Sequence, residues 1–228
     1  MQYLKINISE YIMYYGGAIF VFTILLGFIA SVLFFRKLWI LHSIQINTGE
    51  LVKGLINILK KGNTIEAISM CEDTPGPAAI VLRNVILHYE QGDKELERAS
   101  EDTALTEIPK LESGMNLLAT IAYIAPLLGL LGTVIGMIAV FQVVSNTNEA
   151  LINIKDLSTG IYTSLYTTAA GLCVAIPAFL AYNYLLSRIE TIILDMEKAS
   201  LELIYFFDRN KKITKENPSD SNDKTPYI

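Results

Sequence analysis

The sequence predicts an all-α membrane protein with three transmembrane helices, an N-terminus outside the cell, a C-terminus in the cytoplasm and long cytoplasmic helix extensions. The 228-residue chain is 52% hydrophobic and only 18% charged, whereas a soluble domain is typically about a quarter charged. Its charges are segregated, so that residues 11–35, 113–148 and 157–187 carry none. Each run exceeds the roughly 20 residues that a membrane-spanning helix needs. Buried helices of a soluble protein do not explain these runs, because such helices keep a polar face.

The first predicted span covers residues 11–35 and follows a short N-terminal segment, residues 1–10. Its apolar run is longer than the 7–15 residues or so of a signal-peptide core. Only one basic residue, Lys5, precedes it, and no A-x-A cleavage pattern follows before Arg36. We therefore interpret it as a retained transmembrane helix.

Residues 36–112 are predicted to form helices in the cytoplasm. Asn63, with Glu66 three residues later, has the spacing of a helix-starting capping box. The sequence Pro-Gly-Pro at 75–77 then interrupts the chain. It precedes a helix that we expect to end at Gly92. The apolar positions of this helix, at helical spacing, are 80, 81, 82, 85, 86 and 89.

A further helix is predicted to run from Asp93 without a stop into the second span, residues 117–142. Pro109 is expected to kink this helix and not to end it. The second span would then be the outer half of one long helix.

The second and third spans each carry a face of small residues. The third span is predicted at residues 162–187, and a loop, residues 143–157, joins the two. Small residues let helix backbones approach closely in a membrane, so we expect these faces to pack against each other or against another helix. The packing positions are Gly129, Gly132 and Gly136 in one span and Ser164, Thr168, Gly171 and Ala175 in the other. Pro126 and Pro177 either kink these helices or are tolerated because neighbouring groups satisfy the freed carbonyls.

The third helix is predicted to continue beyond the membrane as a cytoplasmic helix, residues 188–209, because apolar residues recur along it. We interpret these apolar residues as positions that pack against other cytoplasmic helix extensions. Residues 210–228 are polar, and disorder is predicted for them.

Lys and Arg residues set the predicted orientation. Nine lie in residues 36–112 and seven after Ser187, against one before the first span and one in the loop. The positive-inside rule therefore places the large segment and the C-terminus in the cytoplasm.

Several other functions are not indicated. No basic patch suggests nucleic acid, and the two cysteines imply no disulfide framework. Cys71 and His88 lack the neighbouring ligands of a metal site, and no nucleophile–base pair suggests an enzyme. We expect no metal or cofactor.

Two motifs in the second and third predicted spans resemble those of a known protein family. "APLLGLLGTVIGM" is followed about 30 residues later by "TTAAGLCVAIPAFLAYN". Together they resemble the MotA/TolQ/ExbB proton channel family, and ExbB most. The likeness covers residues 117–187 most specifically, and "PGPAAIVLRNVI" and the three-span layout extend it.

The resemblance implies a multi-pass protein of the bacterial inner membrane that assembles as a pentameric ring. Spans two and three would line a pore that holds an ExbD-like single-span partner with an Asp in the membrane. Proton flow would drive motion that energises TonB-type transport, with a TonB-like protein as a possible further partner. The alternatives are a TolQ-like envelope stator, a MotA-like and possibly sodium-driven stator, and a structural membrane scaffold without ion flux.

The segment "TGIYTSLYTTAAGL", residues 159–172, carries seven hydroxyls and no charge. Hydroxyls are less costly at membrane depth than charges, and they can bond back to a carbonyl one turn earlier. The spans contain no Asp, Glu, His or Lys, so the group that binds the proton must come from another chain.

The resemblance assigns Thr133 and Thr168 to the pore. Thr163 stands where many relatives have Glu in a pattern like G-I-x-E-A-L. The predicted ion-pathway residues are Thr133, Thr163, Ser164, Thr167 and Thr168.

Overall fold

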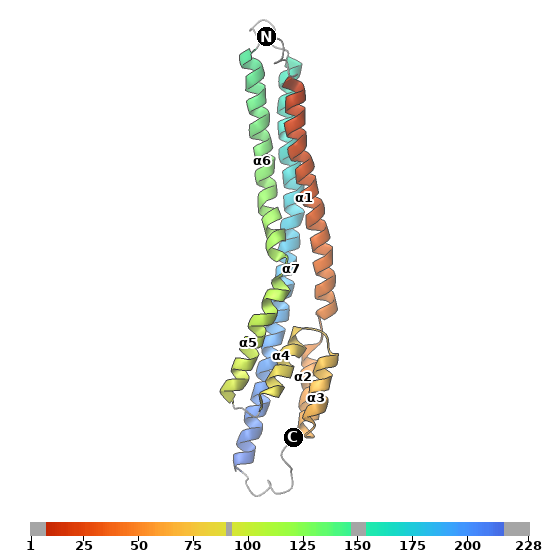
Figure 1. Cartoon of the computed structure of the whole chain (residues 1–228), viewed down its shortest axis with the longest axis vertical. Helices are drawn as coiled ribbons and strands as arrows, with labels where there is room; N and C mark the ends of the chain where they lie inside the picture. The colour runs from red at the N-terminus through yellow and green to blue at the C-terminus, as the bar shows by residue number, and fades with distance from the viewer. Residues whose placement is uncertain (1–7, 90–92, 147–153, 217–228) are drawn as a thin grey trace. The chain divides into compact units, whose positions relative to one another are not determined.

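The computed structural model describes residues 8–89, 93–146 and 154–216, and all regular structure in these ranges is helical (Figure 1). The helices are α1 (Ile8–Ile44), α2 (Thr48–Lys60), α3 (Thr64–Asp73), α4 (Pro77–Leu87), α5 (Asp93–Glu112), α6 (Met115–Asn146) and α7 (Ile154–Glu216). Three of them, α1, α6 and α7, are long and apolar enough to cross a membrane. The prediction of an all-α chain with three long apolar helices is confirmed.

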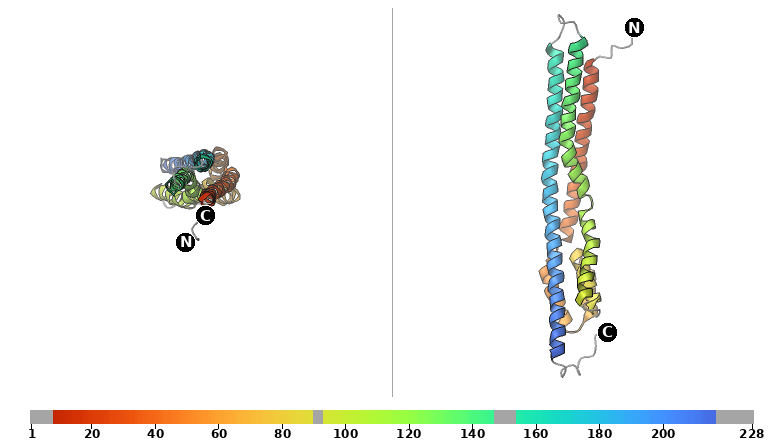
Figure 2. Two further views of the ribbon diagram at one scale, coloured as in Figure 1. Left: turned by 90° about the horizontal axis from the view of Figure 1, so that it is seen from above. Right: turned by 90° about the vertical axis from the view of Figure 1, so that its left-hand side faces the viewer.

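The chain divides into two compact units, each described here by itself. The membrane unit consists of the described residues of Met1–Lys37 and Gly114–Leu185, and the second unit of those of Leu38–Ser113 and Leu186–Ile228. In the membrane unit, the three long helices lie side by side (Figures 1 and 2). Their outer surface consists largely of exposed apolar side chains, such as Phe28 at 66% and Leu127 at 62%, which suits contact with lipid.

A glycine separates α5 from α6. The expected continuous helix through Pro109 into the second span is wrong, because α5 ends at Glu112 and α6 begins at Met115. Between them, Gly114 has a φ of +84°, a left-handed conformation that favours glycine. Pro109 lies inside α5 and does not end it. The Ser-Gly pair at 113–114 is a turn signal that our sequence interpretation gave less weight than the proline.

The last helix is continuous, since α7 runs from Ile154 to Glu216 with Pro177 inside it. This confirms that the third helix continues past the apolar span. Residues 210–216 are helical, so the prediction of disorder from Asn210 is wrong for them; the rest of that tail lies outside the described residues. Helical residues also occupy both ends of the predicted loop 143–157, of which residues 147–153 lie outside the described ranges.

The second unit has a hydrophobic core built by α2 to α5 and the C-terminal part of α7. Helix α4 is buried on most sides, because it packs against both α3 and α5. Its buried residues are Pro77, Ala78, Ala79, Val81, Leu82, Val85 and Ile86. Of the predicted apolar positions, Val81, Leu82, Val85 and Ile86 are buried, Ile80 is 41% exposed, and Tyr89 is partly buried beyond the end of α4.

Local signals set the helix ends of this unit. Asn63 is the N-cap of α3, as predicted, but its side chain donates to Glu66 Oε2 at 2.6 Å in place of the backbone bonds of a capping box. Gly76, with a φ of +115°, precedes Pro77 at the start of α4. The expected end at Gly92 is wrong: α4 ends at Leu87 with His88 as its C-cap, and Gly92 lies outside the described residues.

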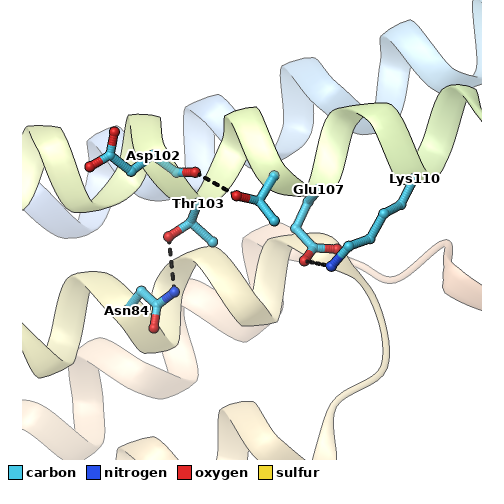
Figure 3. A network of polar contacts seen from close by, with 6 residues as sticks. Asn84, Asp102, Thr103, Glu107 and Lys110 are labelled. Atoms are coloured by element: carbon cyan, nitrogen blue, oxygen red, sulfur yellow. Dashed lines mark hydrogen bonds and ion pairs between the residues drawn. The ribbon is translucent and has the colours of Figure 1, made fainter.

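A buried polar contact joins α4 to α5. Asn84 Nδ2 donates to Thr103 Oγ1 at 2.9 Å (Figure 3). The Thr103 hydroxyl in turn donates to the Ala99 carbonyl at 2.6 Å. One turn further along α5, the ammonium of Lys110 pairs with Glu107. Of these bonds, the one between Asn84 and Thr103 joins α4 to α5, and the other two lie within α5.

Candidate ion-pathway residues at the α6–α7 contact

The small faces of α6 and α7 pack against each other. We call this contact the α6–α7 seam; its residues are Gly129, Gly132 and Gly136 of α6 and Ser164, Thr167, Thr168 and Gly171 of α7. A Cβ atom added at Gly132 would lie 2.7 Å from the Thr167 Cβ, and one at Gly136 would lie 3.0 Å from the Ser164 Cβ. A side chain on these glycines would separate the helices.

Two of the predicted pathway hydroxyls are enclosed in this seam. Ser164 is 2% exposed and Thr167 is 3% exposed. The Ser164 hydroxyl donates to the Gly160 carbonyl at 2.7 Å, and that of Thr167 donates to the Ser164 carbonyl at 2.8 Å. Both hydroxyl protons thus form hydrogen bonds to backbone carbonyls of α7 itself. In a single subunit these side chains fill the space opposite Gly136 and Gly132. Their placement therefore supports a role in helix packing and not a position on the lining of a pore.

Thr168 instead bonds across the seam. Its hydroxyl donates to the Gly129 carbonyl of α6 at 2.9 Å, and the side chain is partly buried. A Cβ on Gly129 would lie 3.1 Å from the Thr168 Cα. The absence of a side chain at Gly129 therefore brings the two backbones close enough for this bond.

Thr133 lies one turn beyond Gly129, on the same side of α6, because residues four apart share a helix face. Its hydroxyl donates to the Leu130 carbonyl at 2.6 Å, and its side chain is partly exposed. Since Thr168 contacts Gly129, the structure brings Thr133 and Thr168 to the same stretch of the seam.

Thr163 faces a different side of α7. It precedes Thr168 by five residues, which turns its side chain by about 140° around the helix axis. Three full turns later on the same side lies Val174, which contacts Gly27 of α1. The hydroxyl of Thr163 donates to the Thr159 carbonyl at 2.9 Å. The structure therefore groups Thr163 with the α1–α7 contact and not with Thr133 and Thr168.

These motifs belong to a region that matches a known family. The family model described as "MotA/TolQ/ExbB proton channel family" matches residues 75–198, which is more than half of the chain and includes the whole seam. The chain belongs to the MotA/TolQ/ExbB proton channel family.

Individual relatives agree with this family. The chain is 28% identical over 177 residues to a putative biopolymer transport protein ExbB homolog of Methanothermobacter thermautotrophicus, covering 77% of this chain and 62% of the relative. It is 33% identical over 146 residues to the biopolymer transport protein exbB1 of Vibrio cholerae, covering 63% of each. A Tol-Pal system protein TolQ of Haemophilus influenzae is 41% identical over 86 residues, covering 38% of this chain and 37% of the relative. The matched region thus spans about three fifths of the length of the two ExbB relatives.

In the membrane unit, sequence reasoning missed the buried hydroxyl of Thr23. Thr23 of α1 is 1% exposed, and its hydroxyl donates to the Ile19 carbonyl at 2.8 Å. It shares a helix face with Gly27, four residues later, which contacts Val174 of α7. The sequence did offer a signal for this residue, because Thr23 is a threonine in an apolar run and lies one helix turn before Gly27.

The two prolines lie within continuous helices. Pro126 is inside α6 and Pro177 is inside α7. Ala125, next to Pro126, approaches Gly171 through its carbonyl, since a Cβ on Gly171 would lie 2.7 Å from that oxygen. Pro126 therefore lies at the seam itself.

The chemistry of the seam follows from its hydroxyls. The hydroxyls of Ser164, Thr167 and Thr168, and that of Thr133 beside them, each donate a proton to a backbone carbonyl. Among the described residues no buried side-chain polar atom lacks a partner. A hydroxyl that donates still has lone pairs to accept. The seam can thus accept a bond from a neutral acid at once, but it can donate to a carboxylate only after giving up a bond to the backbone.

Proposed function

We propose that this protein is the inner-membrane stator subunit of a motor driven by the proton-motive force. It would be ExbB-like and energise a TonB-type transport system through an ExbD-like single-span partner. The observation that carries the proposal is the bond from Thr168 to the Gly129 carbonyl, one helix turn from Thr133, within spans that hold no Asp, Glu, His or Lys. Family membership supports a channel and not an enzyme.

The mechanism follows from what the hydroxyls can do. A protonated Asp on the partner donates to a Thr hydroxyl oxygen while the Thr168–Gly129 bond stays in place. An ionised Asp needs donors, so Thr168 must release the Gly129 carbonyl, at a cost of about 1 kcal/mol for one hydrogen bond. The protonation state of the partner therefore decides which arrangement of the subunit is favoured.

We propose that the spans assemble as a pentameric ring with the N-terminus outside and the C-terminus in the cytoplasm. The Lys and Arg distribution supports this orientation. A fluorescent protein fused to the C-terminus should fluoresce, whereas alkaline phosphatase fused there should be inactive; the reverse pattern would exclude the orientation.

The proposal is tested by proton uptake into vesicles that contain this protein and its partner. Replacing Thr168 with Val should slow coupled uptake about 2- to 10-fold, the effect of one lost hydrogen bond, while the oligomer still assembles. The matched control is Thr120→Val, because Thr120 also lies in α6 and bonds back to the Asn116 carbonyl, but it is exposed and outside the seam. Equal uptake by the two variants would remove the role proposed for Thr168.

Two related functions are alternatives to this proposal. The TolQ relative supports a TolQ-like role in the envelope. Thr163, at a place where many relatives have Glu, leaves a MotA-like or sodium-driven stator as an alternative. Exchanging sodium for potassium in the uptake assay separates the ions, because only a sodium-driven stator would stop.

A further inference from the structure

An apolar cleft of about 690 Å³ lies between α1 and α7 in the membrane unit. It is separate from the α6–α7 seam and has no part in the proposed proton pathway. The α1 side contributes Ile24, Gly27, Ala30, Ser31, Phe34 and Phe35. The α7 side runs from Cys173 to Tyr184. The Ser31 hydroxyl donates to the Gly27 carbonyl at 2.9 Å, so the α1 wall presents an almost wholly apolar surface.

The dimensions of the cleft limit what can fill it. Its walls extend over eleven residue steps on each helix, which is about 16 Å at 1.5 Å per residue. This length is close to half of the roughly 30 Å hydrocarbon core, which is one leaflet. The volume spread over that length leaves a cross-section of about 40 Å² for the centres of water-sized molecules. An extended hydrocarbon chain fits within the cleft.

One end of the cleft is positively charged. Phe34 and Phe35 line that end, and the next two residues are Arg36 and Lys37. Lys37 follows Phe34 by three residues and so lies toward the same face of α1. The cleft thus ends beside two basic residues of α1.

We propose that the α1–α7 cleft binds an anionic phospholipid from the leaflet that meets Arg36 and Lys37. An acyl chain occupies the apolar walls, and the phosphate lies against the two basic side chains. The lipid would support the packing of α1 on α7 beside the contact between Gly27 and Val174. This inference does not depend on proton coupling, and its failure would leave the proposed function untouched.

The test uses the full-length protein in phosphatidylcholine vesicles with trace spin-labelled lipid. Electron paramagnetic resonance measures the motionally restricted fraction of labelled phosphatidylglycerol and of labelled phosphatidylcholine. We expect the wild type to favour phosphatidylglycerol, and each of R36Q and K37Q to lower that preference about fivefold. The double variant K53Q/K60Q, in exposed positions of α2, should leave it unchanged. Equal restriction of both lipids by the wild type would overturn the headgroup site.

A second variant tests the cleft itself. Ala181 lines the cleft, so Ala181→Phe should fill it and lower the restricted fraction of both lipids. Leu127→Phe, on the exposed surface of α6, is the matched control. The proposal fails if Ala181→Phe, checked for helicity and oligomer size, restricts as much lipid as the control.

A photo-crosslinking residue at Leu180, which also lines the cleft, gives an independent readout in the otherwise unchanged protein. Capture of phospholipid supports the proposal, and capture of a second copy of this chain overturns it.

Discussion

At the scale of single residues, Gly171 shows how little space separates α6 from α7. A Cβ there would lie 2.7 Å from the Ala125 carbonyl oxygen and 2.9 Å from the Gly129 Cα. Both are backbone atoms, which cannot move aside as a flexible side chain can. We expect Gly171→Ala to destabilise the protein by about 1–3 kcal/mol, the cost of overpacking. Thermal unfolding of the purified full-length protein measures this.

The control for that substitution is Gly17→Ala in α1, where an added Cβ meets nothing within 4 Å. It should be neutral or slightly stabilising, because Ala is favoured over Gly in a helix. A melting temperature that falls equally in both variants would show that the seam is not tightly packed at Gly171.

Cys71 has an unreactive thiol, since burial raises its pKa from 9.0 to about 11 despite the nearby Arg83 guanidinium. In a Cys173→Ala background at pH 8, the folded protein should react with maleimide about a hundredfold more slowly than an ordinary thiol, because two pKa units remove that much thiolate. Reaction in denaturant should restore the ordinary rate. A fast reaction in the folded protein would contradict the burial of Cys71.

The same pKa shift has a consequence for stability. The unfolded chain loses the Cys71 proton first, so the stabilising effect of the neutral thiol is complete below about pH 9 and is lost as the pH rises toward 11.

At the scale of helices, the junction between α5 and α6 depends on Gly114. Its φ of +84° is unfavourable for other residues, and an added Cβ would meet nothing within 4 Å, so backbone strain alone sets the cost of a substitution. We expect Gly114→Ala to destabilise by about 1–2 kcal/mol. Pro109→Ala should not destabilise, since it restores a backbone N–H inside α5. If Pro109→Ala were the more harmful change, the helix break would not depend on the glycine.

These helices show what the sequence could and could not predict. Uncharged runs predicted the long helices, and recurring apolar residues predicted that α7 continues beyond its span, because both signals are local. Spacing placed Gly129, Gly132 and Gly136 on one face, but spacing does not say which neighbour that face meets. It likewise could not show that the Thr168 hydroxyl bonds across to the Gly129 carbonyl. Those outcomes depend on how the helices are arranged around one another.

At the scale of the whole molecule, the membrane unit is neutral throughout its spans. Its hydroxyls have protons, but their pKa is far too high for them to release protons near neutral pH. Any group that binds and releases a proton in the proposed pathway therefore belongs to the partner. The proposed function therefore requires the partner to be present for protons to flow.

We expect the purified oligomer of this chain alone, in vesicles with a pH gradient, to show no proton uptake above that of protein-free vesicles. Addition of the single-span partner should start uptake, and replacing the partner's membrane Asp with Asn should stop it, because Asn keeps the shape but cannot ionise. A pH-sensitive dye inside the vesicles measures both. Robust uptake by this chain alone would show that its own hydroxyls and bound water conduct protons, and the Thr133–Thr168 pair would then need no partner carboxylate.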